Sequence, residues 1–143
     1  MIKNKRLLTS LLVAIVLIGA LVVPLAASAG KMIVRSGMML VPRHASVPYR
    51  LQVGEFSVTV PVGALPKGGP VIIHTMQKDD WFQVDFLPER QFAAPVMMDF
   101  GTAPVIYYEH NGTQDEIWTS DLDGDGQVGE IYSNHFSRYS GWH

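Results

Sequence analysis

From residue 30 onward, the sequence is a succession of short segments in which apolar and polar residues alternate. Phe56 to Val60 alternates with a period of two, and Phe82, Val84 and Phe86 alternate with polar neighbours in the same way. This period places successive side chains on opposite faces of a strand, as in a half-buried β-sheet. No stretch after residue 30 keeps a helical apolar period for three turns. The pattern therefore predicts an all-β fold.

Turn-forming residues separate these segments. We expect strands over residues 56–60, 71–76, 82–86, 95–100, 105–109, 116–120 and 128–139, with one or two more within residues 32–53. The breaks contain Gly101, Asn111-Gly112 and the Asp-Gly pairs of residues 123–126, which favour tight turns. Short strands with a turn about every eight to twelve residues are typical of a sandwich or small barrel. The prediction is a single antiparallel β-sandwich.

The N-terminus has the three parts of a secretory signal. Three basic residues lie within the first six positions, and Leu11 to Leu25 is almost wholly apolar. Small residues at Ala27 and Ala29 then provide a site that a signal peptidase recognises. We expect residues 1–29 to be a helical signal peptide, so that the protein is secreted or extracytoplasmic.

An uncleaved anchor is the alternative for this segment. No charged residue lies between Leu7 and Gly30, a run long enough to span a bilayer. Pro24 and the small residues after it lie where the helix should end, and no positive cluster follows to stop transfer. Cleavage is therefore the favoured interpretation, and membrane attachment is expected only if the segment stays uncleaved.

Composition limits the classes of partner. All 13 acidic residues follow residue 30, whereas three of the 11 basic residues precede it, so the exported part carries 8 basic against 13 acidic residues. That balance disfavours nucleic-acid binding, which needs a basic face. The chain has no cysteine, so it has no disulfide and no lipid-modified cysteine. Residues 30–143 are enough for one domain with its own core.

One segment resembles a known family. The run Phe56-Ser57-Val58-Thr59-Val60-Pro61-Val62-Gly63-Ala64-Leu65 resembles the opening of the ZU-five domain, named for zonula occludens and uncoordinated netrin-receptor proteins. The later run from Phe92 to Phe100 is similar to its "F-x-x-P-V" strand, and Asn134 to Tyr139 is similar to a closing strand of exported bacterial relatives. The resemblance implies a ZU-five-like β-sandwich over residues 55–143, preceded by an extension or first strands over residues 30–54. It implies an interaction or structural module and not an enzyme, with an unknown protein or cell-surface partner.

An acidic segment gives the first candidate site. Asp121, Asp123 and Asp125 alternate and are followed by Gly126, as at positions 1, 3, 5 and 6 of a calcium loop of the EF-hand type. The Gln127 carbonyl would take position 7. Position 12 needs a bidentate acid, but Tyr132 stands there.

Glu130 lies two residues before that position, so it can serve only if the loop closes differently. The candidate metal ligands are thus Asp121, Asp123, Asp125, Gln127 and Glu130, with calcium as the ion. The alternative is a solvated hairpin turn, where Asp-Gly pairs are common. Three carboxylates within five residues repel one another, which a turn alone does not require.

Two further hypotheses remain open. His135-Phe136-Ser137 matches the His-Phe-Ser self-cleavage site of animal ZU-five proteins, which implies Ser137 as nucleophile, His135 as base and cleavage of the Phe136-Ser137 bond. The alternative is an ordinary strand in which Phe136 faces the core and His135 and Ser137 share the opposite face. Finally, Trp81, Trp118 and Trp142 would form a carbohydrate-binding platform if they are exposed, or part of the core if they are not. The favoured function is an exported, non-catalytic module for protein interaction or structural support, with calcium as a candidate stabilising ion.

Overall fold

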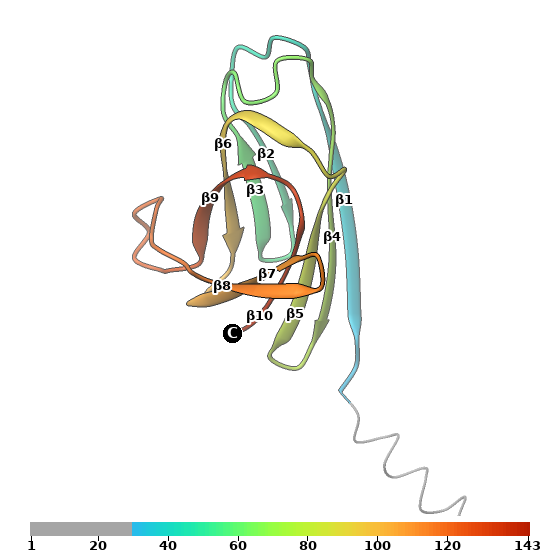
Figure 1. Cartoon of the computed structure of the whole chain (residues 1–143), viewed down its shortest axis with the longest axis vertical. Coiled ribbons are helices and arrows are strands. Elements are labelled where there is room, and N and C mark those ends of the chain that lie inside the picture. Colours follow the sequence, from blue (N-terminus) through green and yellow to red (C-terminus); the bar gives the residue numbers. More distant parts are fainter. Residues whose placement is uncertain (1–29) are drawn as a thin grey trace, which may run out of the picture. The chain divides into compact units, whose positions relative to one another are not determined.

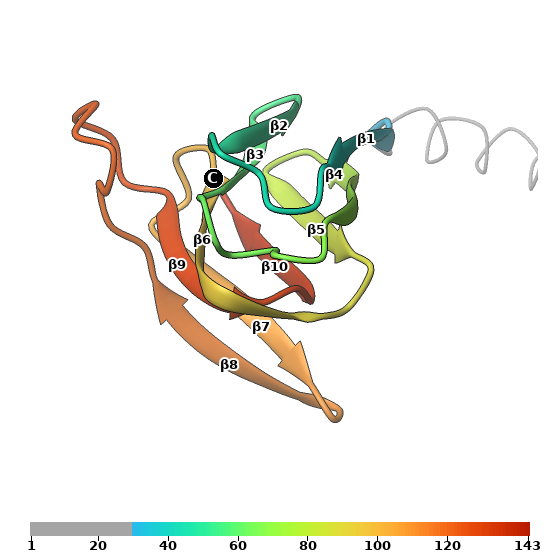
Figure 2. The same ribbon diagram turned by 90° about the horizontal axis from the view of Figure 1, so that it is seen from above.

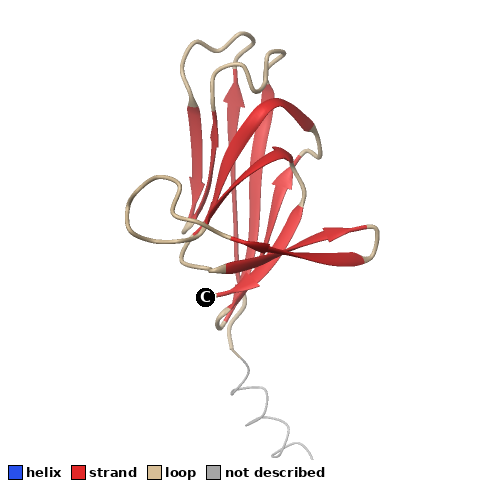
Figure 3. Cartoon of the chain, turned by 60° about the vertical axis from the view of Figure 1, so that its left-hand side comes forward, coloured by secondary structure: helices blue, strands red, loops and turns tan. Residues whose placement is uncertain are grey.

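The computed structural model describes residues 30–143, which form ten strands joined by loops and turns and contain no helix (Figures 1 and 3). The expected signal peptide, residues 1–29, lies outside this described part. The strands are β1 (Ile33–Val41), β2 (Tyr49–Val53), β3 (Phe56–Val60), β4 (Gly69–Lys78), β5 (Trp81–Leu87), β6 (Gln91–Phe100), β7 (Val105–His110), β8 (Thr113–Trp118), β9 (Glu130–His135) and β10 (Arg138–Trp142). Within residues 30–143 there is no helix that could cross a bilayer.

The strands form two sheets, and every pairing between them is antiparallel. One sheet has six strands in the order β1-β4-β5-β10-β7-β8, and the other has four in the order β2-β3-β6-β9. Figure 2 shows the two layers from above, with the β7–β8 hairpin extending beyond the smaller sheet. The all-β prediction is confirmed.

Aromatic side chains from both sheets meet in a shared core. Phe56 of the smaller sheet packs on Phe82 of the larger one, with ring centroids 5.1 Å apart. Phe100 likewise packs on Tyr139 at 5.3 Å. All four side chains are fully or almost fully buried. The alternating sequence accounts for this core, because the apolar residues of each strand face inward and their sequence neighbours face outward.

Residues 30–54 contribute to both sheets. β1 pairs along its whole length with β4 and forms one edge of the larger sheet. β2 pairs with β3 and forms one edge of the smaller sheet. This region therefore provides strands of both sheets and is not an appended tail.

The turn after β3 follows from its sequence. Pro61 directly follows the last paired residue of the strand, Val60. Gly63 has a φ of 85°, a left-handed conformation that favours glycine, and it lets the chain reverse. Ala64 then returns to the core with no exposed surface. Asn111 and Gly112 likewise have positive φ at the turn of the β7–β8 hairpin, where the Asn-Gly pair predicts a turn.

The prediction of one strand over residues 128–139 is wrong. β9 ends at His135 in the smaller sheet, and β10 begins at Arg138 in the larger one, so Phe136 and Ser137 form a crossover between sheets. Apolar residues on both sides of the break conceal it in the sequence, because Ile131 and Tyr139 both face the core. The strand expected over residues 116–120 also begins earlier, at Thr113, and ends at Trp118.

Candidate functional site

The loop between β8 and β9 contains the first candidate site. Figures 1 and 2 show this connection extending to the left of the two sheets. Asp121 organises its start, because its Oδ1 accepts a hydrogen bond from the Gly124 N–H (2.8 Å) and its Oδ2 accepts one from the Gly126 N–H (2.9 Å). Both glycines have positive φ, which is the conformation that brings their N–H groups toward Asp121.

The next two aspartates repeat this type of turn. Asp123 Oδ1 accepts from the Asp125 N–H at 3.0 Å, and Asp125 Oδ1 accepts from the Gln127 N–H at 2.7 Å. Such local carboxylate-to-backbone bonds are the usual stabilising feature of Asp-rich turns. They hold the three exposed carboxylates close to one another.

Glu130 is the fourth carboxylate of this group. One ligand oxygen from each of Asp121, Asp123, Asp125 and Glu130 lies within 4.8 Å of the others. The three aspartates are exposed, whereas Glu130 retains only 2% of its surface. Glu130, and not Tyr132, is thus the acidic residue that the return of the loop brings to the three aspartates.

Pairing of β9 explains the burial of Glu130. Its backbone exchanges two hydrogen bonds with Ser120 at 3.0 Å, which brings the two ends of the loop together. Its Oε2 also accepts from the Leu122 N–H at 3.1 Å. The loop thus covers a carboxylate that would otherwise lie on the outer surface of the sheet.

Asp99 is a further acidic neighbour that the sequence does not indicate. It lies on β6 as the direct cross-strand partner of Glu130, and its Oδ1 accepts from the Gly101 N–H at 2.9 Å. Burial raises the pKa of both carboxyls, and the charges of Asp123 and Asp125 raise the pKa of each further. The site is therefore a concentration of negative charge that is only partly open to water.

The oxygen atoms of this group suit a hard divalent cation. Within residues 30–143, Asp123 Oδ2, Asp125 Oδ2 and Glu130 Oε1 accept no hydrogen bond from the protein. Calcium binds six to eight oxygens from carboxylates, carbonyls and water, and tolerates irregular geometry. Four carboxylates and water would provide most of such a set, with the Gln127 carbonyl as the fifth ligand expected from the sequence. The residues present therefore fit calcium.

The second candidate site lies at the crossover between β9 and β10. Phe136 is 2% exposed and packs edge to face on Phe92 with ring centroids 4.6 Å apart. The backbone on both sides of the Phe136-Ser137 bond is held, since the Phe136 N–H donates to Arg90 O and the Phe86 N–H donates to Ser137 O, each at 3.0 Å. Phe136 faces the core as the strand alternative expects, and His135 and Ser137 line one groove, but residues 136–137 lie between β9 and β10 and do not continue one strand.

His135 and Ser137 both line a groove beside Glu89 and Glu109, but within residues 30–143 no hydrogen bond joins the two side chains. The imidazole of His135 packs on the Tyr108 ring, with centroids 5.0 Å apart. Its backbone N–H donates to Ser133 Oγ at 3.2 Å. Among the described residues, no hydrogen bond joins the His135 ring to the Ser137 hydroxyl. The nucleophile-base contact that self-cleavage requires is not formed.

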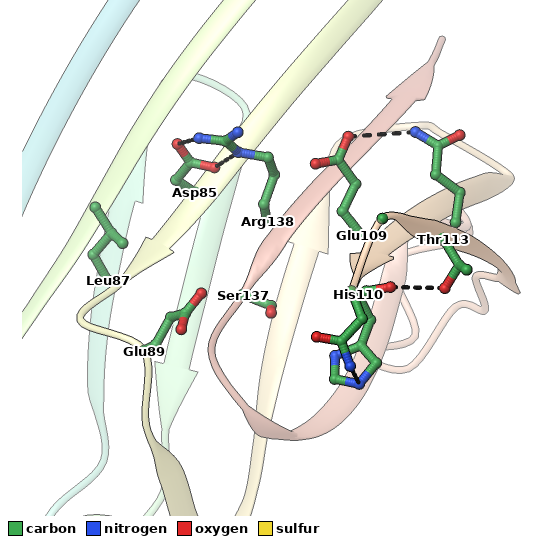
Figure 4. A pocket seen from close by; sticks show the side chains of 11 residues that line it. Asp85, Leu87, Glu89, Glu109, His110, Thr113, Ser137 and Arg138 are labelled. Atoms are coloured by element: carbon green, nitrogen blue, oxygen red, sulfur yellow. Dashed lines mark hydrogen bonds and ion pairs between the residues drawn. The ribbon is translucent and has the colours of Figure 1, made fainter.

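Ser137 also lines a polar groove of about 830 Å³. Figure 4 shows Ser137 between Glu89 on one wall and Glu109 and His110 of the β7–β8 hairpin on the other. The groove also contains Asp85 and Arg138, whose side chains form a bidentate ion pair. Its residues come from strands that are far apart in the sequence, so no motif indicates them.

The tryptophans occupy the outer face of the six-stranded sheet. Trp118 is 71% exposed and Trp142 is 54% exposed, while Trp81 is partly buried. None belongs to the core between the sheets. The structure therefore excludes the interpretation of these residues as core aromatics.

No protein-family model, curated protein or solved structure matches this chain. The resemblance to the ZU-five domain therefore rests on the sequence motifs alone, and the function has to be argued from the residues of the sites themselves.

Proposed function

We propose that this chain is an exported, non-catalytic β-sandwich module of ZU-five-like type that serves protein interaction or structural support and is stabilised by calcium. The observation that carries the proposal is the convergence of Asp121, Asp123 and Asp125 on the buried Glu130. A buried carboxylate beside three others is unfavourable without a compensating positive charge. A divalent cation supplies that charge.

Calcium would act here on stability. The cluster joins the long β8–β9 loop to the first residue of β9, so an ion bound to all four carboxylates fixes the loop against the sheet. An ion that binds the folded state and not the unfolded chain stabilises the fold by mass action. The secreted or extracytoplasmic location expected from the N-terminal sequence provides the calcium concentration that weak sites need.

The geometry at the crossover supports a non-catalytic role. Phe136 fills the core, and His135 packs on Tyr108 without a hydrogen bond to Ser137 among the described residues, although both line one groove. Asp85, the least exposed carboxylate of the groove, is paired with Arg138 and so is not available as a general base. The contacts favour a structural function for this segment over self-cleavage.

Thermal unfolding with and without calcium tests the proposal. A site of the weak extracellular class has a Kd of about 0.1–1 mM, so 10 mM calcium stabilises the fold by about 1.4–2.7 kcal/mol. We expect a clear rise in the unfolding midpoint relative to chelator, and a much smaller rise in the same concentration of magnesium. An unchanged midpoint in 10 mM calcium contradicts the calcium part of the proposal.

A matched pair of variants localises the effect. Asp125→Asn removes one ligand charge from the cluster and should abolish most of the calcium response. Asp115→Asn changes an exposed aspartate on β8 outside the cluster and should leave the response intact. Equal loss in both variants would show a nonspecific charge effect.

A further inference from the structure

All three tryptophans of the chain lie along one line across the larger sheet. Trp81 of β5 and Trp142 of β10 are direct cross-strand partners. Trp118 of β8 is paired with Val105 of β7. β10 and β7 are neighbours with Gly141 opposite Ile106, so the next residues along this register are Trp142 and Val105. The three indoles thus occupy one row over four adjacent strands, β5-β10-β7-β8.

These side chains share the outer face of the sheet. Cross-strand partners point to the same side, and successive residues alternate. The sequence neighbours of this row are buried on the inner side of the sheet. Phe82 follows Trp81, Gly141 precedes Trp142, and Ile106 follows Val105, the partner of Trp118. Tyr107 of β7 also faces outward and packs edge to face against Trp142, with ring centroids 5.7 Å apart. That contact holds the Trp142 ring while more than half of the residue stays exposed.

Polar groups border the indoles. Trp81 and Trp142 line a shallow pocket of about 450 Å³ together with Lys78, Asp79 and Asp80. Asp79 and Asp80 form the turn between β4 and β5, and both are exposed. On the far side, the cross-strand partner of Tyr107 is Glu116, which is also exposed. Aromatic faces bordered mainly by carboxylates suit a ligand that offers flat apolar surfaces and many hydroxyl donors.

The arrangement favours a polysaccharide over a single cation or an acidic ligand. A cation is recognised by rings that converge around one point. Here the indoles of Trp118 and Trp142 lie two strands apart, which is about 10 Å at the usual strand spacing. An extended chain of sugar rings can place its C–H faces on successive indoles, and its hydroxyls can donate to Asp79, Asp80 and Glu116. The three carboxylates outnumber Lys78, the cross-strand partner of Trp81, so the net charge of this border disfavours uronic and sulfated glycans.

We propose that the outer face of the six-stranded sheet binds a neutral polysaccharide through Trp81, Trp142 and Trp118. The inference goes beyond the proposed role in protein interaction or structural support, because it adds a glycan partner, and it does not depend on calcium. Exposed aromatic patches of this kind mark interaction sites in soluble proteins.

A depletion assay with the purified chain tests the proposal, using microcrystalline cellulose, chitin, insoluble xylan and mannan as probes. We expect binding to at least one of them, and a drop of tenfold or more in affinity for Trp142→Ala and for Trp118→Ala. Leu40→Ala is the matched control, since Leu40 is 68% exposed on β1 of the same sheet, and it should bind as the wild type does. Trp142→Phe keeps an aromatic face and should lose less than Trp142→Ala.

The outcomes separate this inference from the rest of the function. Binding that persists in chelator supports the glycan face even if calcium fails to raise the unfolding midpoint. Absence of binding to all four polysaccharides overturns the inference, and so does binding that both alanine variants retain while circular dichroism shows them folded. Polylysine is the basic-peptide probe of the same assay. Binding to polylysine alone also overturns the inference, because that result assigns the face to a basic peptide.

Discussion

Asp85 of β5 and Arg138 of β10 are direct cross-strand partners and form a bidentate ion pair across the groove floor. The Nε–Oδ1 distance is 2.7 Å and the Nη2–Oδ2 distance is 3.1 Å. The two side chains differ in exposure, at 50% for Arg138 and 12% for Asp85. The Asp85 carboxylate thus depends on the arginine for compensation of its charge. The hydrogen bond and the charge of Asp85 raise the pKa of Arg138.

Removing the arginine should therefore lower the free energy of unfolding by more than the loss of an ordinary exposed ion pair does. We expect Arg138→Gln to lower the free energy of unfolding by about 1–2 kcal/mol, between the values for exposed and buried pairs, because one partner is half exposed. The double variant Asp85→Asn/Arg138→Gln should lose less than the sum of the two single variants. Urea unfolding of all four proteins measures the coupling, and additive losses would show that the pair contributes nothing specific.

Glu130→Gln should separate the charge of this residue from its packing. The amide keeps the volume of the side chain and an oxygen that can accept from Leu122 N–H, but it removes a carboxylate whose pKa is raised mainly by burial. We expect a higher unfolding midpoint than wild type in chelator and loss of most of the response to calcium. A lower midpoint in chelator with a retained calcium response would contradict the site.

Gly129 is required where the acidic loop returns to the sheet. Its φ is 142°, and a Cβ there would overlap the carbonyl oxygen of Gly101. Gly129→Ala should therefore cost more than about 3 kcal/mol, or abolish folding, since the backbone of two segments must separate. Gly124→Ala is the matched control, because a Cβ meets nothing within 4 Å and only the φ of 77° is unfavourable. That variant should lose about 1–2 kcal/mol by urea unfolding.

Variants at the crossover distinguish a core position from a reactive one. Phe136→Ala removes a ring packed on Phe92 and should cost about 3–5 kcal/mol. Ser137→Ala changes a side chain at the groove surface and should stay within about 0.5 kcal/mol of wild type. Intact mass should show one species that retains residues 137–143. A fragment ending at Phe136 that disappears in Ser137→Ala would establish self-cleavage and overturn the non-catalytic function.

The sequence predicts local features of this fold and not the pairings between distant segments. Alternation gives β3 with its observed bounds, Phe56–Val60, because the pattern is local, although Ser57 on the opposite face is also buried. Proline at position 95 does not interrupt β6, since it lies in an irregular segment where the register with β9 shifts. Burial cannot be read from residue type alone, as the exposed Trp118 and the buried Glu130 show.

The sequence predicts the local part of the acidic site and not the part that depends on strand pairing. The spacing of Asp121, Asp123 and Asp125 is a local pattern, so the sequence identifies it. The position of Glu130 depends on its pairing with Ser120, and that of Asp99 on its register with β9. Strand register between segments some 30 residues apart has no local signature, so Asp99 could be found only in the folded structure.

Tyr139 should make the stability of the fold depend on alkaline pH. It is 1% exposed, and burial raises the pKa of its hydroxyl above the ordinary value of about 10, against a weaker lowering by Ser133 Oγ at 3.5 Å. The folded state therefore holds this proton more tightly than the unfolded chain does. Its contribution to stability is fully present below about pH 10 and is lost as the pH rises from there through the folded pKa.

Tyr139→Phe should remove that loss. At pH 8 the variant should lie within about 1 kcal/mol of wild type, because a hydrogen bond of 3.5 Å contributes little. Between pH 10 and 11 the urea midpoint of wild type should fall more steeply than that of the variant. Tyr132→Phe changes an exposed ring and should keep the wild-type slope. If Tyr139→Phe also keeps that slope, Tyr139 is not the group that makes the fold sensitive to alkali.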